Sequence, residues 1–348
     1  MVHGIANPHR GTGLALDGPD PIADAAAVAK LLAQCPAHAQ TPLLSLDSVA
    51  TECGVAQVFA KDERDRMGLG SFKALGAAHA IAREAAQAVK DDAWTTALTG
   101  RTYVTASAGN HGLSVAAGAR IFGAQAVVYL SETVPDAFAV RLRDTGATVM
   151  RAGANYEASM DAAERAADDN GWTLLSDSAW DGYVDLPLRV MEGYLQLIAE
   201  TVSQMPDAPT HMIVQAGVGG FAAAVAAHAR SAWGNGPEII VVEPDAAPAL
   251  IESIRAGQIR TTEGPVSDMG RLDCKTPSLI GLKGLSRDAD RFVTLTEDEA
   301  ASGIASLSRD GVVTTPSGGA GLAALFAGLD LPPDARVLAF LTEGPEDA

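Results

Sequence analysis

The 348-residue sequence predicts an α/β fold with two lobes, in which helices flank mostly parallel sheets. Short apolar segments with strand character alternate with helical runs along most of the chain, as in successive β/α units. These strand candidates are too numerous for one compact sheet, which favours two lobes. Three glycine-rich turns follow or flank predicted strands, and ligands of open parallel sheets bind beyond the carboxyl ends of the strands.

Residues 41–55 are expected to begin as an extended segment and to end as a short helix. Residues 263–278 are predicted to form a long irregular loop, of the kind that often lines an enzyme site. Helices are expected at residues 20–35, 72–89, 109–123, 135–146, 155–171, 220–233 and 297–311. Strands or extended segments are expected at residues 58–63, 102–107, 124–130, 147–153, 172–178, 211–217, 238–244, 290–295 and 336–342.

The composition excludes several classes of partner. The chain has 43 acidic and 25 basic residues, and its net charge of −18 repels nucleic acid and anionic membranes. No apolar run reaches the length of a membrane span, and the first residues do not resemble a secretory signal. Cys35, Cys53 and Cys274 show no metal-ligand spacing, so we expect a reduced cytoplasmic protein without a metal site.

The three glycine-rich turns are "TASAGNHG" (105–112), "QAGVGGF" (215–221) and "TPSGGAG" (315–321). The second follows a predicted strand and opens a helix, so its backbone N–H groups and the helix N-terminus could cradle a phosphate. It lacks the lysine and hydroxyl of a P-loop and the GxGxxG spacing of dinucleotide-binding turns, so a nucleoside triphosphate is not predicted. A purely structural turn is the alternative.

Lys73 stands in the segment "RMGLGSFKALGAAHAIA", between Phe72 and a run of small residues. Few polar neighbours indicate a partly buried amine, and burial lowers the pKa of lysine. A neutral lysine can form a Schiff base with a carbonyl group. The alternative is an ordinary lysine on a solvated helix surface.

Taken together, the motifs resemble those of the fold-type II pyridoxal-phosphate enzymes, which include threonine and serine dehydratases, cysteine synthase and the tryptophan synthase β chain. The match runs in the family's order through "GLGSFKALG", "TASAGNHG", "VQAGVGGFAAAV", "TPSGGAGLAAL" and "FLTEG". Within this family, "SDSAWDGY" and "LDCKTPS" are similar to segments of diaminopropionate ammonia-lyase. The resemblance implies a large cofactor-binding lobe, residues 1–97 and 186–348, and a small lobe, residues 98–185.

The resemblance also implies roles for individual residues. Lys73 would bind pyridoxal 5′-phosphate covalently and later move protons at the substrate Cα. Thr342 would meet the pyridine nitrogen, with Ser317 as its rival for that place. The further cofactor contacts would come from Phe72, Asn110, Gly217, Val218, Gly219 and Gly220. The substrate carboxylate would bind to the turn formed by Ser107, Ala108, Gly109 and His111.

One acidic residue of the relatives is kept and another is absent. Asp177, in "SDSAWDGY", matches a catalytic acid, although a turn cap beside Ser176 and Ser178 is the alternative. Ala108 stands where diaminopropionate ammonia-lyases carry a second acid, which the family associates with proton abstraction from the D-isomer. The family associates the acid at the position of Asp177 with the L-isomer, so either Lys73 or Asp177 would remove the Cα proton. We therefore expect an L-configured substrate, and a leaving group other than an amine becomes possible.

These inferences predict a lyase that eliminates the β-substituent of a small L-amino acid and yields a 2-oxo acid and ammonia. Diaminopropionate is the default substrate, and serine, threonine or 3-hydroxyaspartate are its rivals. β-Replacement of the cysteine synthase type, racemisation and a non-catalytic ligand sensor are alternative functions. A homodimer is expected because the relatives form dimers.

Overall fold

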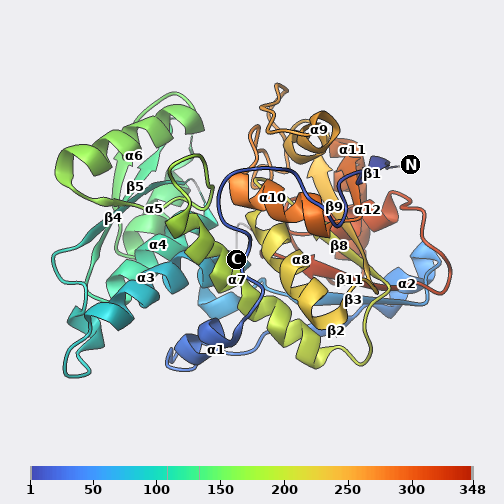
Figure 1. Cartoon of the computed structure of the whole chain (residues 1–348), viewed down its shortest axis with the longest axis horizontal. Coiled ribbons are helices and arrows are strands. Elements are labelled where there is room, and N and C mark those ends of the chain that lie inside the picture. Colours follow the sequence, from blue (N-terminus) through green and yellow to red (C-terminus); the bar gives the residue numbers. More distant parts are fainter. Residues whose placement is uncertain (1, 108, 133, 346–348) are drawn as a thin grey trace.

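The computed structural model describes residues 2–107, 109–132 and 134–345, in which two sheets form the centres of two lobes (Figure 1). The predicted α/β class is confirmed, whereas the lobe boundaries stay a prediction. In order of pairing, the larger sheet contains β1 (His3–Ala6), β10 (Arg291–Leu295), β9 (Glu238–Pro244), β8 (His211–Gln215), β11 (Arg336–Leu341), β3 (Gln57–Asp62) and β2 (Leu43–Ser45). The smaller sheet contains β6 (Thr148–Arg151), β5 (Gln125–Leu130), β4 (Thr102–Ala106) and β7 (Thr173–Leu174).

Strands pair in parallel except at the two edges of the larger sheet. There, β1 pairs antiparallel with β10, and β2 pairs antiparallel with β3. All the pairs of the smaller sheet are parallel. Parallel neighbours need a crossover connection, which explains the alternation of strands and helices along the chain. As a result, the carboxyl ends of the central strands meet at one edge of each sheet.

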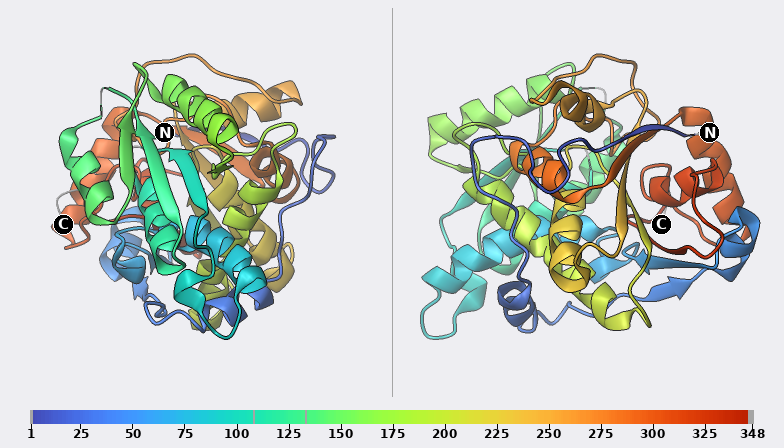
Figure 2. Two further views of the ribbon diagram at one scale, coloured as in Figure 1. Left: turned by 90° about the vertical axis from the view of Figure 1, so that its left-hand side faces the viewer. Right: turned by 45° about the vertical axis from the view of Figure 1, so that its right-hand side comes forward.

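Helices cover both faces of each sheet (Figures 1 and 2). They are α1 (Ala26–Leu32), α2 (Asp47–Cys53), α3 (Gly76–Ala88), α4 (Asn110–Ile121), α5 (Asp136–Asp144), α6 (Tyr156–Asn170), α7 (Asp185–Gln204), α8 (Gly220–Trp233), α9 (Ala249–Ala256), α10 (Leu279–Asp288), α11 (Glu297–Arg309) and α12 (Ala320–Phe326). Short 3₁₀ helices are η1 (Arg66–Gly68), η2 (Phe72–Leu75) and η3 (Trp94–Thr96). Helix α1 is shorter than predicted: it begins at Ala26, whose N–H donates to the carboxylate of Asp24, and it ends at Leu32.

The two faces of the larger sheet bury separate groups of side chains, because successive side chains of a strand point to opposite faces. In β8, Met212 and Val214 pack in the core shared with α7, α8 and α10. Ile213, between them, packs with the side chains of α11 and α12 instead. The smaller sheet buries one face against α6 through Val104 and Ala163, among others.

Helix α7 was not among the predicted elements, although it is the longest helix, with 20 residues. It runs between the two lobes and contacts both α3 and α8 (Figure 1). Gly193 allows this close approach, because a Cβ at that position would collide with the carbonyl oxygen of Leu75. Helix α7 therefore packs directly against the segment that carries Lys73.

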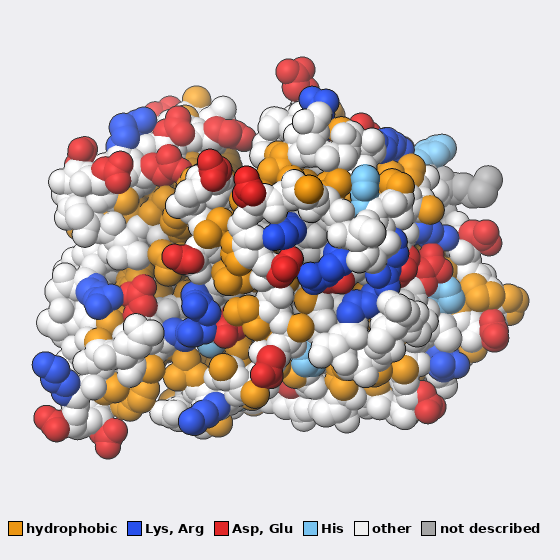
Figure 3. Space-filling model, in the orientation of Figure 1, with side chains coloured by type: hydrophobic (Ala, Val, Ile, Leu, Met, Phe, Trp, Pro, Cys, Tyr) orange, Lys and Arg blue, Asp and Glu red, His pale blue; other side chains and the backbone are white. Residues whose placement is uncertain are grey.

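Charge is unevenly spread over the face of the molecule in Figure 3. Acidic side chains gather over α6, at the upper left, and basic side chains gather near α8 and α10. No helix in the described part of the chain is both long and apolar enough to cross a membrane. Among the same residues, no group of three or more His, Cys, Asp or Glu side chains is arranged to hold a metal ion.

Candidate active site

The segment that carries Lys73 is held by the end of the central strand β11. Ser71 is extended and forms an antiparallel bridge with Glu343. The N–H of Phe72 donates to the carbonyl oxygen of Thr342 at 3.0 Å. The chain then enters η2, so the side chain of Lys73 lies at the carboxyl end of the larger sheet, where parallel sheets bind ligands.

The amine of Lys73 donates a hydrogen bond to the carboxylate of Asp177, 104 residues away in the sequence. The side chain of Lys73 is 23% exposed and that of Asp177 is 18% exposed, which leaves space around the pair for a ligand. Burial alone would lower the pKa of Lys73 and raise that of Asp177, but the opposite charges outweigh burial. The pKa of Lys73 therefore lies above its ordinary value and that of Asp177 lies below. The expected low pKa of Lys73 is wrong for this arrangement, because the sequence does not reveal the neighbouring charge.

Aromatic side chains form one wall beside Lys73. The ring of Phe72 lies 4.9 Å from that of Tyr194 and 4.5 Å from that of Phe221, between ring centroids. The Lys73 amine lies 5.4 Å from the Phe72 centroid and 6.0 Å from the Tyr194 centroid. Tyr194 was missed from the sequence because its helix, α7, was not predicted. The apolar periodicity of α7 is the signal that would have found it.

The glycine turn after β8 has the shape of a phosphate cradle. Gly219 adopts a left-handed conformation with φ of +94°, and Gly220 begins α8. A Cβ at Gly217 would lie 2.9 Å from the Sγ of Cys274, so the loop 263–278 closes over the turn. The first N–H groups of a helix have no partners within it, and they attract anions. The chemistry and the close packing of this turn fit the phosphate group of pyridoxal phosphate.

The turn before α4 is shaped by Ser107, whose Oγ accepts hydrogen bonds from the N–H groups of Gly109 at 3.2 Å and Gly112 at 3.1 Å. His111 is buried, and its Nε2 lies 2.8 Å from the carbonyl oxygen of Leu175. Burial lowers the pKa of His111, and the contact of its ring with Leu175 ties the turn to the segment that follows β7. Ala108, predicted to take part in this site, lies outside the described residues.

Asn110 and Glu343 form a contact between the two lobes. The Asn110 amide donates to the Glu343 carboxylate, which also accepts a hydrogen bond from the hydroxyl of Thr315. Glu343 is only 6% exposed, and it was not predicted from the sequence although it stands in "TEG". The two lobes therefore meet through a polar contact at the predicted cofactor position.

Two hydroxyl groups lie at the carboxyl end of β11, where the pyridine nitrogen is predicted. The buried Oγ1 of Thr342 accepts a hydrogen bond from the amide of Gln215 at 3.2 Å. Ser317 accepts one from the backbone N–H of Arg271 at 3.1 Å. Gln215 also donates to the carbonyl oxygen of Gly318 at 2.8 Å, so it ties β8 to the turn 315–321. Gln215 is the last residue of β8, within a segment predicted as a strand, but nothing in the sequence indicated its role.

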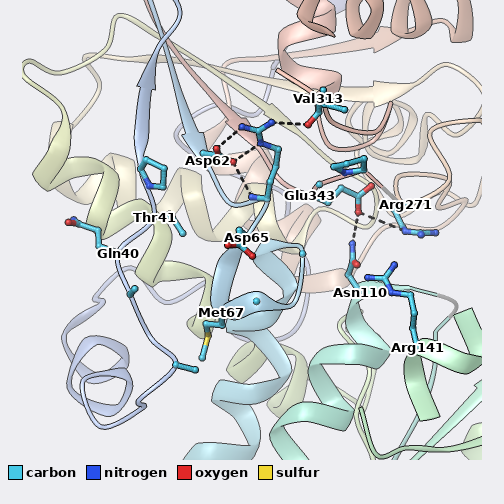
Figure 4. Close-up of a pocket in the computed structure, with 18 of the residues that line it drawn as sticks. Gln40, Thr41, Asp62, Asp65, Met67, Asn110, Arg141, Arg271, Val313 and Glu343 are labelled. Carbon is cyan, nitrogen blue, oxygen red and sulfur yellow. Dashed lines mark hydrogen bonds and ion pairs between the residues drawn. The ribbon is translucent and has the colours of Figure 1, made fainter. Parts of the chain in front are cut away.

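A cavity of about 840 Å³ adjoins this site (Figure 4). It shares Gly70 and Asn110 with the surroundings of Lys73, but Lys73 and Asp177 do not line it. Its charged lining residues are Asp62, Arg64, Asp65, Arg141, Arg271 and Glu343. The cavity therefore offers space and charge for the part of a ligand that extends away from Lys73.

The family model and the related proteins that match this chain agree with each other. The family model described as "Pyridoxal-phosphate dependent enzyme" matches residues 35–343. The diaminopropionate ammonia-lyase of Escherichia coli (strain K12) is 32% identical over 337 residues, which cover 88% of this chain and 85% of that protein. The L-threonine ammonia-lyase of Thermotoga maritima is 28% identical, with coverage of 83% and 67%.

The solved structures agree with this result. Diaminopropionate ammonia-lyase from Escherichia coli, in complex with an aminoacrylate–PLP azomethine reaction intermediate, matches with a TM-score of 0.88 and 29% identity. The match covers 100% of this chain and 94% of that chain.

Proposed function

Because the chain belongs to the family of pyridoxal-phosphate-dependent enzymes, we propose that it is an ammonia-lyase that eliminates the β-substituent of a small L-amino acid. The products would be a 2-oxo acid and ammonia. The predicted cofactor, lyase class and similarity to diaminopropionate ammonia-lyase are confirmed by the family match and the relatives. The roles of individual residues are proposals.

The contact between Lys73 and Asp177 carries the proposal. It places an amine and a carboxylate together at the carboxyl end of the larger sheet, beside an aromatic wall. Lysine is the residue that can both bind a carbonyl cofactor and exchange protons with a substrate. A lysine on a solvated helix surface would have neither the carboxylate partner nor the wall.

Several residues would hold the cofactor. The turn Gly217–Gly220 would bind its phosphate, Asn110 its ring hydroxyl and Thr342 its ring nitrogen. When bound, pyridoxal phosphate supplies an electron sink that makes the Cα proton of the amino acid acidic. Phe72 would pack against the cofactor and exclude water from the reacting atoms.

The chain's own groups would then move the protons. As a free amine, Lys73 would take the Cα proton of the substrate. Asp177 stabilises the resulting ammonium, as the raised pKa of Lys73 beside this carboxylate indicates. The same ammonium is an acid for the departing β-substituent. N–H groups of the turn 107–111 would hold the substrate carboxylate during these steps.

The sequence favours an L-configured substrate, because Ala108 stands where diaminopropionate ammonia-lyases carry a second acid. Diaminopropionate is the default substrate within this proposal. The 3-hydroxy amino acids are the second candidate, because the L-threonine ammonia-lyase of Thermotoga maritima is also similar to this chain. Accumulation of a 2-oxo acid without a second nucleophile would exclude β-replacement.

The proposal is tested with purified protein that has been loaded with pyridoxal phosphate. We expect an absorption band of the covalently bound cofactor, and release of 2-oxo acid and ammonia from L-amino acids that carry a β leaving group. Lys73→Ala should abolish the band and the turnover, whereas Lys90→Ala, at an exposed position, should change neither. Failure of the wild-type protein to bind pyridoxal phosphate would refute the proposal.

We also propose a cytoplasmic location and a homodimer. The three cysteines are unpaired, which suits a reducing compartment. The dimer is inferred from the family resemblance alone. Light scattering after size-exclusion chromatography would test it, and a mass near the 35.7 kDa of one chain would contradict it.

A further inference from the structure

We propose that Arg141 and Arg271 form a subsite for a second carboxylate on the substrate. The preferred substrate would then be an L-amino acid whose side chain carries an acidic group as well as the β leaving group. The inference rests on the proposed β-elimination and adds the substrate class to it. It depends on the cavity beside the active site, which both arginines line.

Arg271 lies directly on the turn that is proposed to bind the substrate. A Cβ at Gly109 would be 2.9 Å from the Nε of Arg271. The guanidinium lies over the ring of Phe138, 5.0 Å from its centroid, and such stacking fixes its orientation. Its backbone is held by the hydroxyl of Ser317. The long loop thus places a positive charge beside the predicted carboxylate turn.

Arg141 approaches the same space from helix α5 of the other lobe. Its side chain is partly buried, and a Cβ at Gly70 would lie 3.9 Å from its Nη2. Among the described residues, no carboxylate lies within ion-pairing distance of Arg141, and its guanidinium donates no hydrogen bond. A partly buried guanidinium gains most from a bound anion, because its donors are otherwise incompletely satisfied.

Among the described residues, the acidic groups of the cavity form no ion pair with Arg141, whereas Glu343 forms one with Arg271. Asp62 is engaged by Arg64 through two hydrogen bonds, of 2.8 and 2.7 Å. Glu343 accepts hydrogen bonds from Asn110 and Thr315, and one of its oxygens lies 3.9 Å from the Nε of Arg271. Asp65 is exposed to solvent.

Figure 4 shows Arg141 and Arg271 on the side of Asn110, away from the pair formed by Arg64 and Asp62. An anion on this side of the cavity would meet two guanidinium groups, one from each lobe. The planar fork of a guanidinium matches the two oxygens of a carboxylate.

The chemistry balances for a 3-hydroxy dicarboxylic amino acid. The Cα–H and Cβ–O bonds break, the proton passes to Lys73, and the hydroxyl leaves with a proton as water. Hydrolysis of the released imine consumes one water and yields ammonia and a 2-oxo dicarboxylate. The reaction needs no oxidant or reductant.

The test compares 3-hydroxy-L-aspartate with L-serine, which have the same leaving group and differ by the carboxylate on Cβ. With the enzyme loaded with pyridoxal phosphate, we expect kcat/KM to be at least about tenfold higher for 3-hydroxy-L-aspartate than for L-serine. A factor of about ten corresponds to the free energy of one hydrogen bond to a charged group. Arg141→Gln should lower kcat/KM for 3-hydroxyaspartate by about 10- to 100-fold and leave L-serine within about threefold. Arg141→Lys, which keeps the charge, should lose less.

Arg143→Gln is the matched control, because Arg143 is exposed on the same helix and does not line the cavity. It should leave both substrates unchanged. Binding of succinate, measured by calorimetry on the loaded enzyme, should weaken by a similar factor in Arg141→Gln, and circular dichroism verifies the fold of each variant. Equal losses for both substrates, or unchanged succinate binding in a folded variant, would overturn the subsite.

β-Chloro-L-alanine separates this inference from the proposed function. Turnover of β-chloro-L-alanine together with a preference for L-serine or diaminopropionate over 3-hydroxyaspartate would overturn the subsite and keep the β-elimination. No 2-oxo acid from any of these compounds would refute the β-elimination and the subsite with it.

Discussion

Replacement of Glu200 by Gln tests the ionic network that supports the Lys73 segment. Glu200, on α7, accepts hydrogen bonds from Lys61 at 2.8 Å and from Arg66 at 2.7 Å. Arg66 also pairs with Glu63 at 2.7 Å, and Thr41 bridges Arg66 and Glu63 through its hydroxyl. The four charged side chains are at most 4% exposed. The network fixes η1, which leads into the Lys73 segment, against α7.

The magnitude follows from the charge balance of the cluster. Lys61 and Arg66 carry two positive charges, which Glu63 and Glu200 compensate. Glu200→Gln leaves one buried positive charge without compensation, and loss of one partner of a buried ion pair costs about 3–5 kcal/mol. With an unfolding entropy of about 0.7 kcal/mol/K for a chain of this size, Tm should fall by about 4–7 °C.

Urea unfolding of the loaded protein measures this loss, which should appear as a lower midpoint with an unchanged slope. The matched control is Glu252→Gln on α9, where Glu252 and Arg255 are 41% and 48% exposed. An exposed pair contributes below about 1 kcal/mol, so this control should remain near the wild type. If Glu200→Gln were as stable as the control, the argument from charge balance would be wrong.

The pH dependence gives a second test of Glu200. Burial alone would raise the pKa of Glu200, but Arg66 and Lys61 outweigh burial and lower it to about 2, from an ordinary value of 4.5. A lowered carboxyl pKa stabilises the folded state above pH 4.5, and this stabilisation is lost as the pH falls towards 2. The Glu200→Gln variant should lack this part of the acid dependence, and equal acid profiles would contradict the assignment.

Three further predictions concern single positions. Gly217→Ala should raise the dissociation constant of pyridoxal phosphate by about tenfold or more, because the new methyl group would displace Cys274; equilibrium dialysis measures it. Gly193→Ala should lower the free energy of unfolding by about 1–3 kcal/mol, because its Cβ would collide with the carbonyl of Leu75, and an unchanged urea midpoint would refute this contact. Burial raises the pKa of Glu243 to about 8, so wild-type stability should fall as the pH rises from 4.5 to 8. Between these pH values the folded state holds a proton on Glu243 that the unfolded state releases. The Glu243→Gln variant should not show this fall in stability. If the urea midpoints of the variant and the wild type changed in parallel with pH, the prediction would be wrong.

Most of the fold could be predicted because its signals are local. Apolar runs such as residues 211–217 and 238–244 became the parallel strands β8 and β9. The glycine turn after β8 was recognisable because its backbone needs positive φ at Gly219 and close contact at Gly217. Helices α7, α9 and α10 and strand β1 were not among the predicted elements.

The sequence by itself therefore determined the α/β alternation, the place of Lys73 between Phe72 and a run of small residues, and the glycine turns at the strand ends. Only the tertiary structure decided the charge state of Lys73, because its pKa depends on Asp177, which belongs to a distant part of the chain. The same holds for Arg141, which the packing of the two lobes leaves in the cavity without an acidic partner among the described residues. Charge and burial depend on distances in space, and a linear sequence does not contain those distances.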